Sequence, residues 1–280
     1  MNEILQEIID TGVSLDEILK ASEGVDFNNQ KEATEFYRKY IKPKISDILD
    51  EYRYSNMLSS LATHIVNTNS NLIQAFVLNP ATNLLSGKNI PDYFKGIVNA
   101  FPEAIREARL AFRGERILER PDIKRMRTNH PLVKWMYPIT NALEASDVFF
   151  RTIIENGEID QAIGNRTYIS PKELKKIKNE ASMKAAKVVF RESLDPENKS
   201  GQGHLLSALD KLTVAILKAR DVKAVSWFVP FVQTPMSIFK QGIEYSPFGL
   251  TTLPGNINKK EQLAKTMIGS MVFMTAGLFA

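Results

Sequence analysis

The sequence predicts an all-α fold, an irregular multi-helix bundle whose apolar helices towards the C-terminus are broken by proline. Apolar residues recur at helical spacing in nearly every segment of the chain. No segment sustains the strict apolar–polar alternation of a half-buried strand, and no Asn-Gly or Asp-Gly pair joins two such segments in a hairpin. Helices are therefore the elements from which we expect the fold to be built.

The first helices are marked by polar caps and by a proline. Ser14 and Glu17 form a capping box that opens a short helix. Asn28 or Asn29 begins a longer helix, because a short polar side chain at the helix start can accept a hydrogen bond from a free backbone amide. Pro43 then bends or splits this helix, since proline removes an amide donor and clashes with the preceding turn.

The stretch from Leu58 to Leu85 is unusually apolar, yet asparagines are spread through it. They are Asn67, Asn69, Asn71, Asn79 and Asn83. An asparagine amide buried among apolar side chains costs free energy unless it is hydrogen-bonded. The pattern therefore predicts a polar network that fixes how the helices pack, and a ligand-binding role is the alternative.

Two longer helices are expected in the middle of the chain. The segment from Pro91 to Phe112 predicts an amphipathic helix. Its apolar residues at i, i+3 and i+7 are Ile105, Ala108 and Phe112. Lys134 to Ile154 predicts a second helix, bent near Pro138, with Gly157 as its C-cap.

The strongest start signal belongs to the helix that follows Ser170. Ser170 is a good N-cap, Pro171 suits the first helical position, and Glu173 completes a capping box. The buried stripe is expected to contain Leu174, Ile177, Ala181 and Val188. Lysines occupy the other faces: Lys172, Lys175, Lys176, Lys178, Lys184 and Lys187.

The polar stretch at residues 195–203, DPENKSGQG, is the clearest linker of the chain. A helix follows it, with leucine and isoleucine at i, i+4, i+7 and i+11: Leu205, Leu209, Leu212 and Ile216. Polar sequence also gives way to apolar sequence near residue 54. We therefore predict an N-terminal helical segment (1–53), a central helical domain (54–194) and a C-terminal apolar helical region (204–280).

Composition and motifs exclude several classes of site. The absence of cysteine excludes disulfides and thiolate zinc centres, and the net charge of +4 permits anionic partners without requiring them. None of His64, His130 and His204 has a second histidine or carboxylate at a metal-ligand spacing. We expect no catalytic, cofactor-binding or metal-binding residue and no enzymatic activity; an enzyme whose site carries no motif stays the alternative.

A dense basic segment is a candidate for contact with phosphate groups of DNA or lipid. It contains Lys124, Arg125 and Arg127. Cations of this kind neutralise phosphates without reading sequence. The alternative is a solvated helix face with internal ion pairs, because acidic residues are interleaved just upstream. The lysine-rich face after Ser170 carries the same two interpretations.

The C-terminal part of the chain contains two apolar segments. Trp227 to Pro247 is aromatic and interrupted by prolines, so it predicts short helical pieces joined by fixed bends. The second segment runs from Leu263 to Ala280 and has one lysine near its start. Candidate membrane-contact residues in it are Met267, Gly269, Phe273 and Gly277. Membrane contact and burial in a protein core are both compatible with these segments.

Three blocks of sequence resemble a family of known proteins. They are RYSNMLSSLATHIVNTNSN from Arg53, LEASDVFF from Leu143, and PFVQTPMSIFKQGIEYSPFGL from Pro230. In this order they are similar to blocks of the large polyvalent proteins of bacteriophages and related mobile elements, which include internal virion (DNA-ejection) proteins. The chain departs from the pattern at Ser237, where the family usually has asparagine. Matching positions, and hence candidate functional residues, are Ser59, His64, Asn67, Asn71, Asp147, Pro230, Phe231, Thr234, Pro235 and Pro247.

The resemblance implies a non-enzymatic phage structural protein that assists genome delivery across the host envelope. Such a protein would be made in the bacterial cytoplasm, packed inside the virion and then moved into the host cell envelope. Its expected partners are other virion proteins, further copies of itself, host membrane lipid and, without sequence specificity, DNA; no cofactor is expected. The alternative is a soluble helical scaffold or interaction module of a larger phage polyvalent protein.

Overall fold

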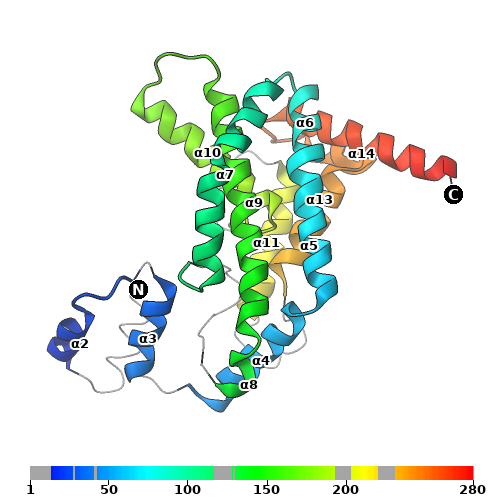
Figure 1. The fold of residues 1–280 in the computed structure, drawn as a ribbon. Coiled ribbons are helices and arrows are strands. Elements are labelled where there is room, and N and C mark those ends of the chain that lie inside the picture. Colours follow the sequence, from blue (N-terminus) through cyan, green and yellow to red (C-terminus); the bar gives the residue numbers. More distant parts are fainter. Residues whose placement is uncertain are drawn as a thin grey trace. The chain divides into compact units, whose positions relative to one another are not determined.

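The computed structural model describes residues 14–27, 29–40, 43–116, 128, 130–192, 203–219 and 231–279 (Figure 1). Within these ranges every regular element is a helix, so the predicted all-α fold is confirmed. The predicted linker at 195–203 lies almost wholly outside the described residues. Pro230 and the basic segment at 124–127 also lie outside them.

The helices follow one another along the chain with mostly short connections. In order they are α2 (Leu15–Ser22), α3 (Gln30–Tyr40), α4 (Ile45–Leu58), α5 (Leu61–Ile73), the π-helix η1 (Gln74–Leu78), α6 (Asn79–Leu85), α7 (Ile90–Phe112), α8 (Pro131–Lys134), α9 (Tyr137–Ile163), α10 (Pro171–Val188), α11 (His204–Ala219), α13 (Gln233–Glu244), the 3-10 helix η3 (Pro247–Thr252) and α14 (Lys259–Phe279).

Contacts group the chain into two compact units. Unit 1 combines Met1–Asn67, Ile105–Leu118 and Lys124–Val148; unit 2 combines Thr68–Ala104, Glu119–Ile123 and Phe149–Ala280. The helices α5, α7 and α9 contribute to both units. This grouping by contacts differs from the three predicted segments (1–53, 54–194 and 204–280). It does not test them as separate domains, so these boundaries stay a prediction.

Unit 1 begins as the cap signals predict. The Ser14 side chain accepts a hydrogen bond from the Glu17 amide at 3.3 Å, which starts α2. Pro43 separates α3 from α4, so the predicted split is correct. A small apolar core forms where Ile18 of α2 and Phe36 of α3 pack together. This core is local to the first helices.

The core of unit 2 is built where α7 and α9 pass very close to each other (Figure 1). A Cβ atom at Gly96 would lie 2.6 Å from the backbone oxygen of Asn156 and 2.9 Å from the Cα of Gly157. Only glycine fits at such a distance from a backbone. The apolar side chains of this core are Ala75, Tyr93, Ile97, Ala100, Ala104, Phe150, Ile153, Ile154, Ala185, Val188 and Val189.

Three predictions about these helices are wrong. Gly157 does not cap a helix, because α9 continues through it to Ile163 and uses it for close packing against Tyr93. Pro138 does not bend the helix either, since α9 starts at Tyr137 and a proline in the first turn needs no amide partner. The predicted stripe of α7 has the right period and the wrong phase. Ile105 and Phe112 are exposed, while small residues such as Ala104 and Ala111 face inward.

The helix α10 confirms its sequence signals. Ser170 caps it by accepting from the Glu173 amide at 3.2 Å, and Ile177, Ala181 and Val188 are buried as predicted. In α11, by contrast, the predicted apolar stripe is wrong. Its buried residues are Leu206, Asp210 and Thr213, whereas Leu205 and Leu212 are exposed. The polar side chains of Asp210 and Thr213 are therefore buried beside Leu206 in unit 2.

Candidate functional site

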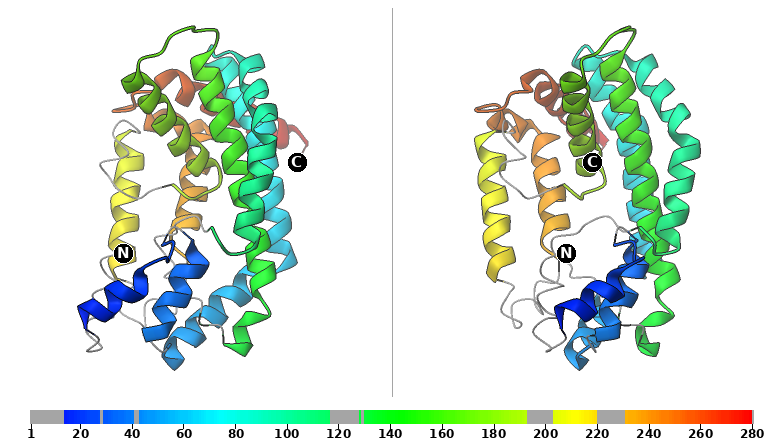
Figure 2. Two further views of the ribbon diagram at one scale, coloured as in Figure 1. Left: turned by 60° about the vertical axis from the view of Figure 1, so that its left-hand side comes forward. Right: turned by 90° about the vertical axis from the view of Figure 1, so that its left-hand side faces the viewer.

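The same inversion of polarity is clearest in α13, which runs beside α11 (Figure 2). Its buried residues are polar or charged: Gln233, Ser237, Lys240, Gln241 and Glu244. They recur every three or four residues, which places them on one side of a helix. The apolar residues Ile238 and Phe239 lie on the other side and are 53% and 57% exposed. The helix thus turns its polar side inward, against the usual arrangement.

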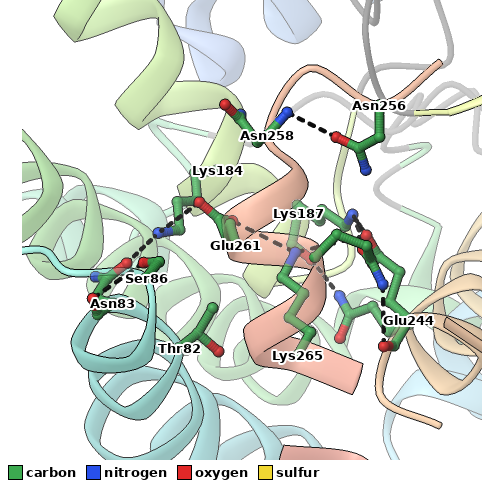
Figure 3. A network of polar contacts seen from close by, with 12 residues as sticks. Thr82, Asn83, Ser86, Lys184, Lys187, Glu244, Asn256, Asn258, Glu261 and Lys265 are labelled. Carbon is green, nitrogen blue, oxygen red and sulfur yellow. Dashed lines mark hydrogen bonds and ion pairs between the residues drawn. The ribbon is translucent and has the colours of Figure 1, made fainter. Parts of the chain in front are cut away.

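The polar side of α13 takes part in a network of buried ion pairs. One group, the Glu261 cluster, contains Lys88, Glu158, Lys184, Lys187, Glu244, Glu261 and Lys265. Of these, only the Lys88 side chain is exposed, at 40%. Figure 3 shows Lys184, Lys187, Glu244, Glu261 and Lys265. Lys187 Nζ lies 2.7 Å from the Glu244 carboxylate, and Lys184 Nζ lies 2.8 Å from that of Glu158. Together they join α9, α10, α13 and α14 through charges.

Glu261 is the most shared member of this cluster. Its carboxylate lies 3.1 Å from Lys88 Nζ, 3.5 Å from Lys265 Nζ and 3.8 Å from Lys184 Nζ. Lys265 also approaches Glu244, at 3.5 Å. The loop before α7, the helix α10 and the helix α13 are therefore all linked to α14 through its Glu261 and Lys265.

Amide groups of the asparagine-rich stretch contact both the cluster and the polar side of α13. Asn83 donates to Glu158 at 3.0 Å and accepts from Lys184 at 2.9 Å. Gln74, in the π-helix, donates to Gln241 of α13 at 2.7 Å. These bonds support the predicted role of the stretch as a polar network that fixes helix packing.

A second group, the Lys240 cluster, lies between α10, α11 and α13. Lys240 Nζ donates to Asp210 at 2.7 Å and also contacts Glu192. Ser237 donates to the Glu192 carboxylate at 3.1 Å.

The electrostatics of the network favour fixed charges. Burial alone would raise the pKa of Glu261, but Lys184, Lys265 and Lys88 outweigh it and hold this pKa well below its usual range. Burial would lower the pKa of Lys265, yet Glu244 and Glu261 raise it. The pKa of Lys240 is raised in the same way by Glu192 and Asp210. Groups with such shifts neither take up nor release protons near neutral pH, so this arrangement suits structure better than acid–base catalysis.

The position of α14 depends on one close approach. A Cβ atom at Gly269 would overlap the backbone carbonyl of Tyr245, so only glycine permits this contact. Gln262 donates to the Glu244 carbonyl oxygen at 3.2 Å on the same side of the helix. Gly269, a candidate membrane-contact residue, therefore packs within unit 2.

The outer sides of these helices are apolar and uncharged. Both charged residues between Phe231 and Asn258, Lys240 and Glu244, point inward. The continuous helix formed by α5, η1 and α6 contains no Asp, Glu, Lys or Arg. Large exposed side chains on its unit 2 part are Leu72, Ile73, Phe76, Val77, Leu84 and Leu85.

Two of the three matching sequence blocks meet in unit 1. Asn67 of α5 donates to Asp147 of α9 at 2.6 Å. Ser59 caps the end of α4, where its hydroxyl donates to the Asn56 carbonyl oxygen at 3.0 Å. His64 is half-buried on α5, and its buried Nε2 atom has no hydrogen-bond partner among the described residues.

The other candidate residues that the structure describes are Asn71 on α5 and four residues near the start and end of α13. Asn71 is fully buried in unit 2. Thr234 and Pro235 lie in the first turn of α13, half-buried Phe231 precedes it, and Pro247 begins η3. The prolines thus separate short helices, as the sequence predicts.

Of the candidate membrane residues, Met267 and Phe273 are exposed, and Gly277 lies in the last turns of α14. Among the residues that the structure describes, no helix is long and apolar enough to cross a membrane. The described residues also contain no group of three or more His, Asp or Glu side chains that could hold a metal ion.

The sequence interpretation missed most of the network. Lys184 and Lys187 had been assigned to outer faces of α10, and Lys88, Glu158 and Glu261 carried no motif. A signal does exist in α13, where polar residues at i, i+4, i+7, i+8 and i+11 share one helix face. Comparison with protein-family models, with curated proteins and with solved structures finds no match.

Proposed function

We propose that this chain is a non-enzymatic phage structural protein of the internal virion type, which assists genome delivery across the host envelope. The resemblance of its three sequence blocks supports the biological setting. The observation that supports the physical mechanism is the end of α14, where apolar side chains are exposed on every side of the helix.

The exposed end of α14 is expected to be covered by protein or lipid. Met271, Val272, Phe273 and Met274 are 58%, 63%, 71% and 69% exposed. Consecutive helix residues point about 100° apart, so these four cover the whole circumference. A helix that is apolar all round is normally buried in protein or lipid. Burying one such side chain contributes about 1.5–3 kcal/mol.

In the proposed mechanism, other virion proteins or further copies of the chain cover these surfaces inside the particle. During delivery, the same surfaces contact host lipid. The basic segment at Lys124, Arg125 and Arg127 would meet phosphate groups of DNA or lipid, without a preference for sequence. The protein would be made in the bacterial cytoplasm before it is packed.

A second candidate is a soluble helical scaffold or interaction module of a larger phage polyvalent protein. The closely packed core of α7, α9 and α10 favours it, because this core resembles that of an ordinary globular protein. In that case the apolar end of α14 would contact another part of the same protein.

Liposome flotation tests the proposal with the full chain and vesicles of phosphatidylethanolamine and phosphatidylglycerol. We expect the wild-type chain to float, also at high salt, and the double variant Val272→Ser, Phe273→Ser to float several-fold less. These side chains are exposed, so their replacement leaves the fold intact.

The matched control is Tyr168→Ser, which removes another exposed aromatic side chain of unit 2, between α9 and α10. It should float like the wild type. A folded wild-type chain that stays at the bottom of the gradient would rule out the lipid-contact mechanism and leave the scaffold interpretation.

A further inference from the structure

The way in which α14 is attached to unit 2 differs from ordinary helix packing. The inward side of α14 consists of Glu261, Gln262, Lys265, Thr266 and Gly269, with Ala264 as its buried apolar residue. Most of its large apolar side chains, such as Leu263 and Met267, are exposed instead, and Ile268 is half-buried. The helix is therefore attached mainly by polar contacts.

The apolar core of unit 2 is built without α14. Its described members come from η1, α7, α9, α10 and the residue after α10. Burial of apolar area is the main favourable term in folding. Removing α14 would therefore leave most of this term in place, and the remaining helices would keep their core.

Ion pairs, rather than apolar packing, hold α14 on unit 2. Glu261 is shared by Lys88, Lys184 and Lys265, and Lys265 also contacts Glu244. Figure 3 shows Glu261 with Lys184, Lys265 and Glu244. A buried ion pair gains little over the hydrated charges, because desolvation offsets most of the attraction. When α14 separates, both partners regain water together. Loss of one partner alone is costly, because it leaves the other buried and uncompensated.

We infer that α14 is a detachable helix, held on unit 2 by the shared carboxylate of Glu261, and that it opens as a unit while the core of α7, α9 and α10 stays folded. Gln262 and Thr266 also donate hydrogen bonds to the Glu244 carbonyl oxygen, at 3.2 and 3.4 Å. These bonds form when α14 attaches, at the same time as the ion pairs. Once released, α14 has a hydrated polar side and an apolar side.

This inference does not depend on the proposed phage function, because it concerns local stability alone. Opening of part of a structure is seen as faster amide exchange confined to that part. Mass spectrometry of amide hydrogen exchange on the full chain therefore tests it directly. The peptides to compare cover residues 262–271 of α14, 93–104 of α7 and 150–161 of α9.

In the variant Glu261→Gln, the α14 amides should exchange on the order of a hundredfold faster, whereas the α7 and α9 amides change little. The matched control is Glu180→Gln, which removes an exposed carboxylate 3.8 Å from Lys176 on α10. It should leave exchange in all three helices as in the wild type. Unchanged α14 exchange in Glu261→Gln, or an equal rise in all three helices, would overturn the inference.

A second variant breaks the attachment without changing a charge. Gly269→Ala places a methyl group against the Tyr245 carbonyl and should also accelerate exchange in α14 alone. If both variants fail to fold, the wild type in low concentrations of urea decides. The free energy of the opening that exposes the α14 amides should then depend less on urea concentration than that of the opening that exposes the α7 and α9 amides. The same urea dependence in all three helices contradicts the inference.

Discussion

At the scale of single residues, Gly96 permits the closest backbone approach of the unit 2 core. A methyl group there would meet the Asn156 backbone oxygen at 2.6 Å, and a backbone cannot move aside cheaply. We therefore expect Gly96→Ala to lower the free energy of unfolding by about 1–3 kcal/mol. Urea denaturation followed by circular dichroism measures the change.

Gly242 is the matched control for this substitution. It also lies inside a helix, α13, but a Cβ atom there would have no neighbour within 4 Å. Gly242→Ala should be neutral or stabilise the protein by about 0.5–1 kcal/mol, because alanine loses less backbone freedom than glycine in a helix. Equal effects of the two substitutions would mean that α7 and α9 are not closely packed.

Lys240 is the second residue whose replacement separates two explanations. Its ammonium group is buried between the carboxylates of Asp210 and Glu192. Lys240→Met keeps the length of the side chain but removes the charge, and it should cost about 3–5 kcal/mol because buried carboxylates lose their cation. Urea denaturation measures this cost beside Lys178→Met, an exposed lysine of α10. A small effect of Lys240→Met would show that solvent reaches the cluster.

At the scale of helices, sequence reasoning gave the existence of most elements but often the wrong face. Caps and prolines act locally, so Ser14, Pro43 and Ser170 placed their helix ends correctly. The buried side of α11 was wrong because apolar residues were assumed to face inward. Asp210 faces inward instead, since its partner Lys240 lies on α13.

The candidate site was only partly predictable for the same reason. Repeated asparagines in an apolar stretch indicated a polar network, and Asn83 is indeed part of one. Its charged members come from helices far apart in sequence, and none of them forms a motif. Glu261 becomes notable only when Lys88 and Lys184 are seen beside it.

At the scale of the whole molecule, the charges of the Glu261 and Lys240 clusters balance. The lysines Lys88, Lys184, Lys187, Lys240 and Lys265 face an equal number of carboxylates, namely Glu158, Glu192, Asp210, Glu244 and Glu261. Balance of this kind allows many charges to be buried together, since each has an oppositely charged neighbour. It also makes stability depend on all of them keeping their charge.

This dependence predicts how stability varies with pH. Lysines lower the pKa of both Glu244 and Glu261 in the folded protein, against an ordinary value of 4.5. Below about pH 4.5 the unfolded chain binds protons that the folded chain refuses, so stability falls as the pH falls. Each carboxylate contributes up to about 1.4 kcal/mol per pH unit to this loss. Lys240 and Lys265, with raised pKa values, give the opposite limb, in which stability falls as the pH rises above about 10.5.

Urea midpoints between pH 3 and pH 11 should therefore form a plateau near neutral pH with a loss on each side. The variant Glu261→Gln removes one of the two carboxylates that resist protonation, so its acidic limb should be shallower although its plateau is lower. Glu180 forms only an exposed ion pair with Lys176, and Glu180→Gln should reproduce the wild-type curve. An acidic limb of wild-type slope in Glu261→Gln would mean that the carboxylate is already hydrated in the folded protein. The network would then stabilise unit 2 through packing and hydrogen bonds, and the attachment of α14 through charge would have no basis.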